Sequence, residues 1–152
     1  MKRLVAIGAA SLAAVASADT ANLNVTANIK GTCQIQSVRS VDFGDLTQGT
    51  TAADKTAPGS LVYWCTKGVS YSVSLGNGNN YSANLRRMKG QASTNQTEYL
   101  PYQLTSSSPT SGIGKGPQAP ETHNVSGTVK GADYNTLSVG GFLDTVVVTV
   151  NP

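Results

Sequence analysis

Residues 23–29 are Leu-Asn-Val-Thr-Ala-Asn-Ile, a run in which apolar and polar side chains alternate strictly. This period of two predicts a β-strand with one apolar face, because successive side chains of a strand point to opposite sides. The apolar face carries Leu23, Val25, Ala27 and Ile29. Taken alone, the pattern favours an ordinary first strand that pairs within its own sheet.

Similar short alternating runs continue along the chain, separated by clusters of Gly, Asn, Pro and Ser. Helical periodicity is nearly absent after residue 18, and charged residues, which include good helix formers, are only 12% of the chain. We therefore predict an all-β sandwich or barrel of about seven strands. The first begins at 23–29 and continues to about Val38, and the others lie at 61–65, 69–75, 81–88, 99–104, 123–129 and 142–150. Residues 106–120 are predicted to form a loop.

Residues 1–18 have the three parts of a secretory signal peptide: a basic start, an apolar run and small residues before a cut after Ala18. The apolar run is too short to span a bilayer. Without Lys2 and Arg3, the mature chain has nine basic and eight acidic residues. That balance gives no reason to expect a nucleic-acid partner. The length of the mature chain suits a single domain.

The chain has two cysteines, Cys33 and Cys65. In an exported protein an even count most simply predicts one disulfide. Two thiols and the single histidine, His123, are too few soft ligands for a metal site. We therefore expect neither a metal nor a cofactor.

Catalysis is not predicted, because no nucleophile elbow, zinc-binding helix or phosphate loop is present. His123 lies in a polar neighbourhood and is interpreted as an exposed residue at a strand end. Asp42 and Asp45 flank Phe43-Gly44, which we interpret as a turn anchored by Phe43 and bent at Gly44. No catalytic residue is assigned.

Five segments, in this order and spacing, resemble the spore coat protein U family, which includes the subunits of archaic chaperone–usher pili. They are Leu-Asn-Val-Thr-Ala-Asn-Ile at 23–29 leading into Cys33, Val-Asp-Phe-Gly-Asp-Leu at 41–46, Leu-Val-Tyr-Trp-Cys at 61–65, Leu-Pro-Tyr-Gln-Leu at 100–104 and Gly-Gly-Phe-Leu-Asp-Thr-Val-Val-Val-Thr-Val at 140–150. The resemblance covers essentially the whole mature chain.

This resemblance implies an immunoglobulin-like sandwich, residues 31–152, that lacks its last strand. Residues 19–30 would then be a donor strand that presents Leu23, Val25, Ala27 and Ile29 to the groove of a neighbouring subunit. Val146, Val148 and Val150 would form one wall of that groove. Two departures from the family pattern stand out: Ala27 is small for a donor residue, and the sequence ends Asn151-Pro152 without the aromatic residue that a chaperone often contacts.

The implied partners are identical or related pilins, a periplasmic chaperone and an outer-membrane usher. The implied location is a cell-surface fibre reached through the periplasm, with a role in adhesion or biofilm formation. The alternative is a self-contained secreted sandwich, either a coat component or a carbohydrate-binding module that uses Trp64 and the six tyrosines for stacking. For Trp64 we favour a packing role.

Overall fold

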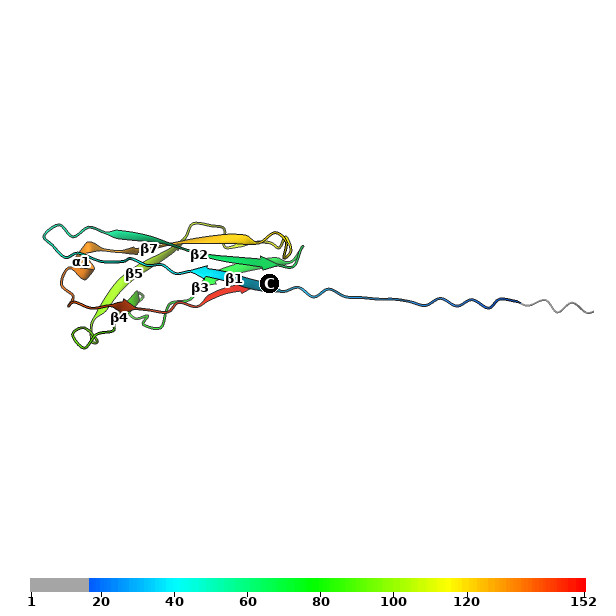
Figure 1. Cartoon of the computed structure of the whole chain (residues 1–152), viewed down its shortest axis with the longest axis horizontal. Helices are drawn as coiled ribbons and strands as arrows, with labels where there is room; N and C mark the ends of the chain where they lie inside the picture. Colours follow the sequence, from blue (N-terminus) through cyan, green and yellow to red (C-terminus); the bar gives the residue numbers. More distant parts are fainter. Residues whose placement is uncertain (1–16) are drawn as a thin grey trace, which may run out of the picture.

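The computed structural model describes residues 17–152, so nearly all of the predicted signal peptide lies outside the described residues. Strands dominate this part of the chain, and its helical content is a single turn (Figure 1). The elements are β1 (Cys33–Arg39), β2 (Lys55–Cys65), β3 (Ser70–Leu75), β4 (Arg86–Gly90), β5 (Tyr99–Ser106), β6 (Ser111–Ile113), β7 (Glu121–Val129), α1 (Gly131–Tyr134), β8 (Phe142–Leu143) and β9 (Val148–Asn151).

Two antiparallel sheets form an immunoglobulin-like β-sandwich, which confirms the predicted fold class. The larger sheet has the order β1-β2-β7-β5-β4-β8, and the smaller has the order β6-β3-β9. The β2–β7 ladder, from Lys55↔Val129 to Tyr63↔Glu121, is the longest pairing of the larger sheet. Along β2 and β7 every second residue is buried, as expected for strands with one face on a core.

The predicted disulfide between Cys33 and Cys65 is present and joins directly opposite positions of the β1–β2 ladder. The two cysteines are 32 positions apart in sequence. In the chain-entropy model, a loop of this length gives a stabilisation of about 3–4 kcal/mol. The bridge therefore fixes β1, the strand that follows the N-terminal segment, to β2 of the larger sheet.

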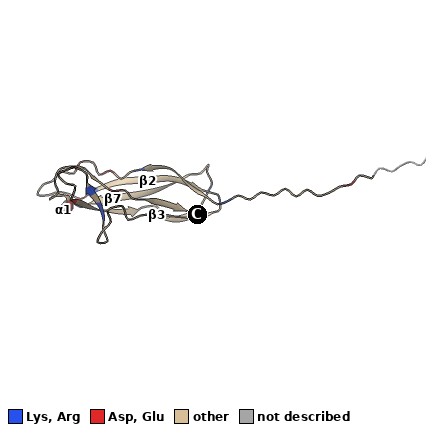
Figure 2. Cartoon of the chain, turned by 90° about the horizontal axis from the view of Figure 1, so that it is seen from below, with Lys and Arg blue, Asp and Glu red and all other residues tan. Residues whose placement is uncertain are grey.

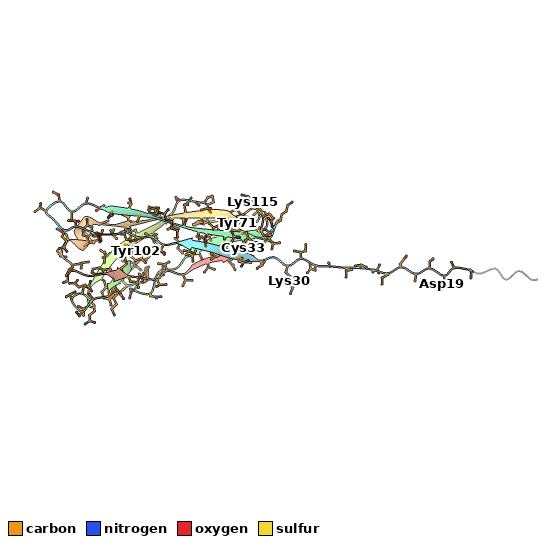
Figure 3. The ribbon with its side chains drawn as sticks, in the orientation of Figure 1. Asp19, Lys30, Cys33, Tyr71, Tyr102 and Lys115 are labelled. Atoms are coloured by element: carbon orange, nitrogen blue, oxygen red, sulfur yellow. A yellow bond between two sulfur atoms is a disulfide. The ribbon has the colours of Figure 1, made fainter. Side chains whose placement is uncertain are left out.

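The buried side chains form two clusters rather than one continuous core. The first comprises Phe43, Ala57, Leu100, Tyr102, Val129 and Tyr134. The second comprises Leu61, Tyr63, Cys65, Tyr71 and Val73. Figure 3 shows Cys33 and Tyr71 near the end from which the N-terminal segment leaves, and Tyr102 nearer the opposite end. A domain of this size usually has one contiguous core, so the division indicates incomplete filling between the sheets.

Several strand boundaries differ from the prediction. β2 begins at Lys55, six positions earlier than expected, and the predicted loop at 106–120 contains β6. The predicted strand at 81–88 instead starts as a tight turn, in which Ala83 and Asn84 have positive φ, and β4 follows it. The predicted strand at 142–150 is interrupted at 144–147, where the backbone bonds to a loop and not to a strand.

The interpretation of His123 as an exposed residue is wrong. Its side chain is only 1% exposed and lies on the inner face of β7, in phase with Val125 and Val129. Its Nε2 atom is 3.0 Å from the Ser106 hydroxyl. The period of two along β7 places His123 inside, and the polar residues next to it in sequence occupy the outer face or the strand end.

Candidate functional site

The N-terminal segment, residues 19–30, is extended and leaves the sandwich along its long axis, close to the C-terminal end of the chain (Figure 1). Its apolar side chains are among the most exposed in the described part of the chain: Leu23 is 88%, Val25 87% and Ile29 85% exposed. The ordinary first strand that the alternation alone favoured is therefore not observed within residues 17–152. A contiguous exposed apolar face of this kind marks a surface that binds a partner. We call residues 19–30 the tail.

The base of the tail is fixed to the sandwich by backbone and side-chain contacts. The Thr32 amide donates to Thr66 Oγ1 at 3.1 Å, and the Thr66 amide donates to the Thr32 carbonyl at 2.8 Å. Gly31 packs closely on Val69, since a Cβ at Gly31 would lie 2.9 Å from Val69 Cγ2. These contacts set the direction in which the tail leaves the domain.

A groove of about 1350 Å³ runs along the sandwich between residues 38–48 on one side and 137–148 on the other. Its lining includes residues of both core clusters, such as Leu61 and Leu100. Further apolar residues of the lining are Leu75, Met88, Leu104, Val125 and Leu137. The groove is therefore the space that separates the two core clusters. It is open to solvent, and the residues at its base are mostly apolar.

The first wall of the groove is the segment 38–48, which continues from β1. Phe43 is buried and packs on the backbone of Gly127 in β7. Gly44 has a φ of +59°, and its amide donates to Asp42 Oδ1 at 2.8 Å. Phe43 therefore anchors this segment as predicted, whereas the predicted sharp bend at Gly44 is wrong, because the chain continues through 41–48 without one. Asp42 accepts this local hydrogen bond, and Asp45 offers its backbone carbonyl to Lys55 Nζ.

The second wall is the segment 142–150, in which alternate side chains are partly buried. Val146 and Val148 line the groove, whereas Val150 lies beyond its lining and packs against the second core cluster. The structure thus brings two of the three predicted wall residues to the groove.

One edge of the second wall is already paired. β9 pairs with β3, and the Gly76 amide donates to the Val147 carbonyl at 2.8 Å. Because backbone groups of successive residues in an extended chain point to opposite edges, the amides and carbonyls of Val146 and Val148 face the groove. Groups of this kind are a template for an added strand.

A polar cluster interrupts this wall at Asp144, which sequence reasoning did not select. Tyr102 Oη donates to Asp144 Oδ2 at 2.6 Å, and the Asn80 amide and Nδ2 donate to Asp144 Oδ1 at 3.2 and 2.9 Å. Burial, followed by the hydrogen bond to Asp144, raises the pKa of the Tyr102 hydroxyl. Asp144 is the one charged residue of 142–150 and is in phase with Val146 and Val148, a signal that could have identified it.

Features that would favour other functions are weak in the described residues. Residues 17–152 contain no group of three or more His, Cys, Asp or Glu side chains arranged to hold a metal. Charged residues are sparse along the sheets apart from β4, which carries Arg86, Arg87 and Lys89 (Figure 2). Four of the six tyrosines are buried: Tyr63, Tyr71, Tyr102 and Tyr134. Trp64 is half-buried on the outer face of β2.

Within residues 17–152, no helix has the length and apolar character needed to cross a bilayer.

Fold and groove together define an immunoglobulin-like sandwich with an open apolar groove and a free apolar tail. A family model described as the Spore Coat Protein U domain matches residues 19–149. The chain belongs to the spore coat protein U domain family. No curated protein matches the chain.

Among solved structures, the chain is similar to a crystal structure of the CsuC–CsuE chaperone–tip adhesion subunit pre-assembly complex from archaic chaperone-usher Csu pili of Acinetobacter baumannii. The TM-score is 0.54 with 24% sequence identity, and the match covers 81% of this chain and 40% of the solved chain. The present chain thus corresponds to less than half of the solved one, and the likeness concerns the fold.

Proposed function

We propose that this protein is a structural subunit of an extracellular pilus, assembled by donor-strand exchange through a chaperone–usher pathway. The observation that carries the proposal is the pairing, in one chain, of an exposed apolar tail with an open apolar groove. Membership of the spore coat protein U domain family and the fold shared with a Csu pilus complex support it. The tail of one subunit fills the groove of the next, which completes the sandwich.

The energetics favour this use of the tail. Burying Leu23, Val25, Ala27 and Ile29 contributes on the order of 5–9 kcal/mol, and hydrogen bonds to the open edge of the groove add to this. Part of this is offset by the entropy of association and of ordering the tail. A durable fibre therefore also needs slow release of the strand, which enclosure between the two walls provides.

The geometry also supports one polarity of assembly. The tail leaves from the end of the sandwich where β9 terminates (Figure 1). If an acceptor subunit were inverted, its own tail would point back at the donor, and growth would stop after two subunits. Continuous head-to-tail growth requires all subunits to share one direction, so the incoming strand runs antiparallel to β9.

Before assembly, the groove exposes apolar side chains and free backbone groups that would promote aggregation. A periplasmic chaperone covers the groove, and an outer-membrane usher is the site of exchange for the tail of the next subunit. The predicted signal peptide provides entry to the periplasm. The finished fibre lies on the cell surface and serves adhesion or biofilm formation.

The test separates the donor and acceptor functions. A variant without residues 19–30 is an acceptor only, and the Val148→Lys variant, with a charge in the groove, is a donor only. Neither should form fibres alone, whereas mixing them should give one-to-one complexes that grow no further.

A synthetic peptide of residues 19–30 should raise the Tm of the acceptor-only variant. A Val25→Asp peptide is the control. Failure of the unmodified peptide to bind would contradict the proposal.

A further inference from the structure

We infer that Ala27 of the tail is matched to the Asp144–Tyr102 pair of the acceptor subunit, and that this match sets the register of the inserted strand. The inference rests on the proposed function and specifies how the tail sits in the groove. Its starting point is the inward position of Asp144, whose carboxylate accepts three hydrogen bonds. The other charged residues of the groove lining, Arg39, Asp42 and Asp45, all belong to the first wall, so Asp144 is the one charge on the second wall.

The alternation of the two strands limits the possible registers. Inward residues of the wall have even numbers, as Val146 and Val148 do, and apolar residues of the tail have odd numbers. In an antiparallel pair, directly opposite side chains lie on the same face of the sheet. The apolar side chains of the tail therefore point into the groove only if an odd-numbered tail residue lies opposite an even-numbered wall residue. A shift of one residue would turn the whole apolar face of the tail outward. The allowed registers therefore differ by steps of two.

Four allowed registers place an apolar tail residue opposite Asp144, and they differ in which residue this is. Leu23, Val25 and Ile29 are branched, and each of them would cover the carboxylate with apolar surface and remove its remaining water at a cost. Ala27 has one methyl group and leaves room for the hydrogen-bonded carboxylate. The favoured register therefore pairs Ala27 with Asp144. The other opposite pairs are then Leu23 with Val148, Val25 with Val146 and Ile29 with Phe142.

This arrangement gives a reason for the small residue in the tail. Each of the three branched tail residues lies opposite an apolar residue of the groove lining, and the small one lies opposite the charge. Gly78 lies close to Asp144, since a Cβ there would collide with Asp144 Oδ2. This contact and the three hydrogen bonds restrict movement of the carboxylate away from an incoming side chain. Ala27 and Asp144 thus act together as a specificity device against shifted strands.

Disulfide trapping in assembled fibres tests the register. Opposite residues in an antiparallel pair have Cα atoms about 4.5–5.5 Å apart, within the range that a disulfide spans. Fibres that carry Val25→Cys with Val146→Cys should form a covalent ladder on mild oxidation, seen on a non-reducing denaturing gel. Val25→Cys with Val148→Cys, and Leu23→Cys with Val146→Cys, report the two registers shifted by two residues in either direction and should link poorly.

A ladder from either shifted pair in place of the first would overturn the inference while leaving strand exchange intact. Fibres in which none of the three pairs links would overturn it as well. If the unmodified chain forms no fibres, the proposed function itself fails.

A second measurement tests the coupling between the two residues. Ala27→Leu should lower fibre yield by about tenfold or more, because the larger side chain overpacks against a carboxylate whose movement is restricted. Thr26→Leu, on the outward face, is the matched control and should have little effect. Asp144→Ala should restore part of the yield of Ala27→Leu, which a purely structural role of Asp144 would not do. Additive losses in the double variant would overturn the match.

Discussion

Phe43 lies directly over the backbone of Gly127, so close that a Cβ at Gly127 would be 2.9 Å from Phe43 Cζ. The same Cβ would lie 2.5 Å from Val41 Cγ1. Through this contact the first wall of the groove, which has no strand ladder of its own after Arg39, is held on β7. The absence of a side chain at position 127 therefore determines where the wall lies and how wide the groove is.

Replacing this glycine should loosen the wall. We expect Gly127→Ala to lower the free energy of unfolding by about 1–3 kcal/mol, because Val41 and Phe43 must both move. The measurement is urea unfolding of the complex between the acceptor-only variant and the tail peptide, and peptide affinity should fall with stability. Gly49→Ala, where no atom lies within 4 Å of the new Cβ, is the control and should change stability little. Equal effects at the two positions would contradict this role.

The first wall shows what the sequence could and could not predict. The anchoring role of Phe43 was predictable, because a lone bulky apolar residue between polar neighbours is expected to be buried. The sharp bend expected at Gly44 is absent, since the chain stays extended along the groove. The packing partner of Phe43, Gly127, was not predictable, because nothing near Gly127 in sequence indicates which distant side chain lies against it. The Cys33–Cys65 bridge was predictable because no other pairing of two cysteines exists.

The second wall was predicted in part from the sequence. The alternation at 142–150 correctly predicts which side chains face inward, since that depends only on the period of an extended chain. It does not predict the break between β8 and β9, which depends on hydrogen bonds from the distant loop at 76–80, such as that from the Asn79 amide to the Thr145 carbonyl. Sequence alone also left open whether the tail pairs within its own chain, a question that depends on tertiary structure.

His123 should contribute to stability as a core residue. We expect His123→Ala to lower the free energy of unfolding by about 2–4 kcal/mol, because it leaves a cavity beside Leu61 and removes a hydrogen bond to Ser106. Thr122→Ala, on the outer face of β7, is the matched control and should have an effect within about 0.5 kcal/mol. Urea unfolding of the acceptor–peptide complex measures both. Similar stabilities of the two variants would show that His123 does not fill the core.

Alkaline pH should destabilise the fold through Tyr102. Its pKa is raised in the folded state by burial and by the Asp144 carboxylate, relative to about 10 in the unfolded chain. Above that pH the unfolded chain releases the proton while the folded chain retains it, so the stability present below pH 10 is progressively lost as pH rises. Tyr102→Phe should therefore show a shallower loss of stability between pH 9 and 11.

The same substitution should lower stability at pH 7 by about 1–3 kcal/mol, because Asp144 loses one hydrogen-bond donor. Tm measured against pH for the acceptor–peptide complex gives both effects. The control is Tyr81→Phe, at an exposed position. An unchanged alkaline slope in Tyr102→Phe would argue that this hydroxyl does not titrate with folding. Tyr63, whose pKa is also raised by burial, would then account for the slope.

The two faces of the tail should respond differently to the same charge. Val25→Asp should abolish fibre formation, because insertion would bury an unpaired carboxylate at a cost of several kcal/mol, comparable to the whole gain from apolar burial. Thr26→Asp places the charge one position along, on the face directed away from the groove, and should assemble at nearly the unmodified yield. Both variants retain an intact groove and should still bind the tail peptide, which separates failure to donate from failure to fold.

Electron microscopy of surface fibres and comparison of boiled with unboiled samples on denaturing gels measure assembly. Equal assembly by both variants would mean that side-chain alternation in the tail has no role, and the groove would then need another occupant.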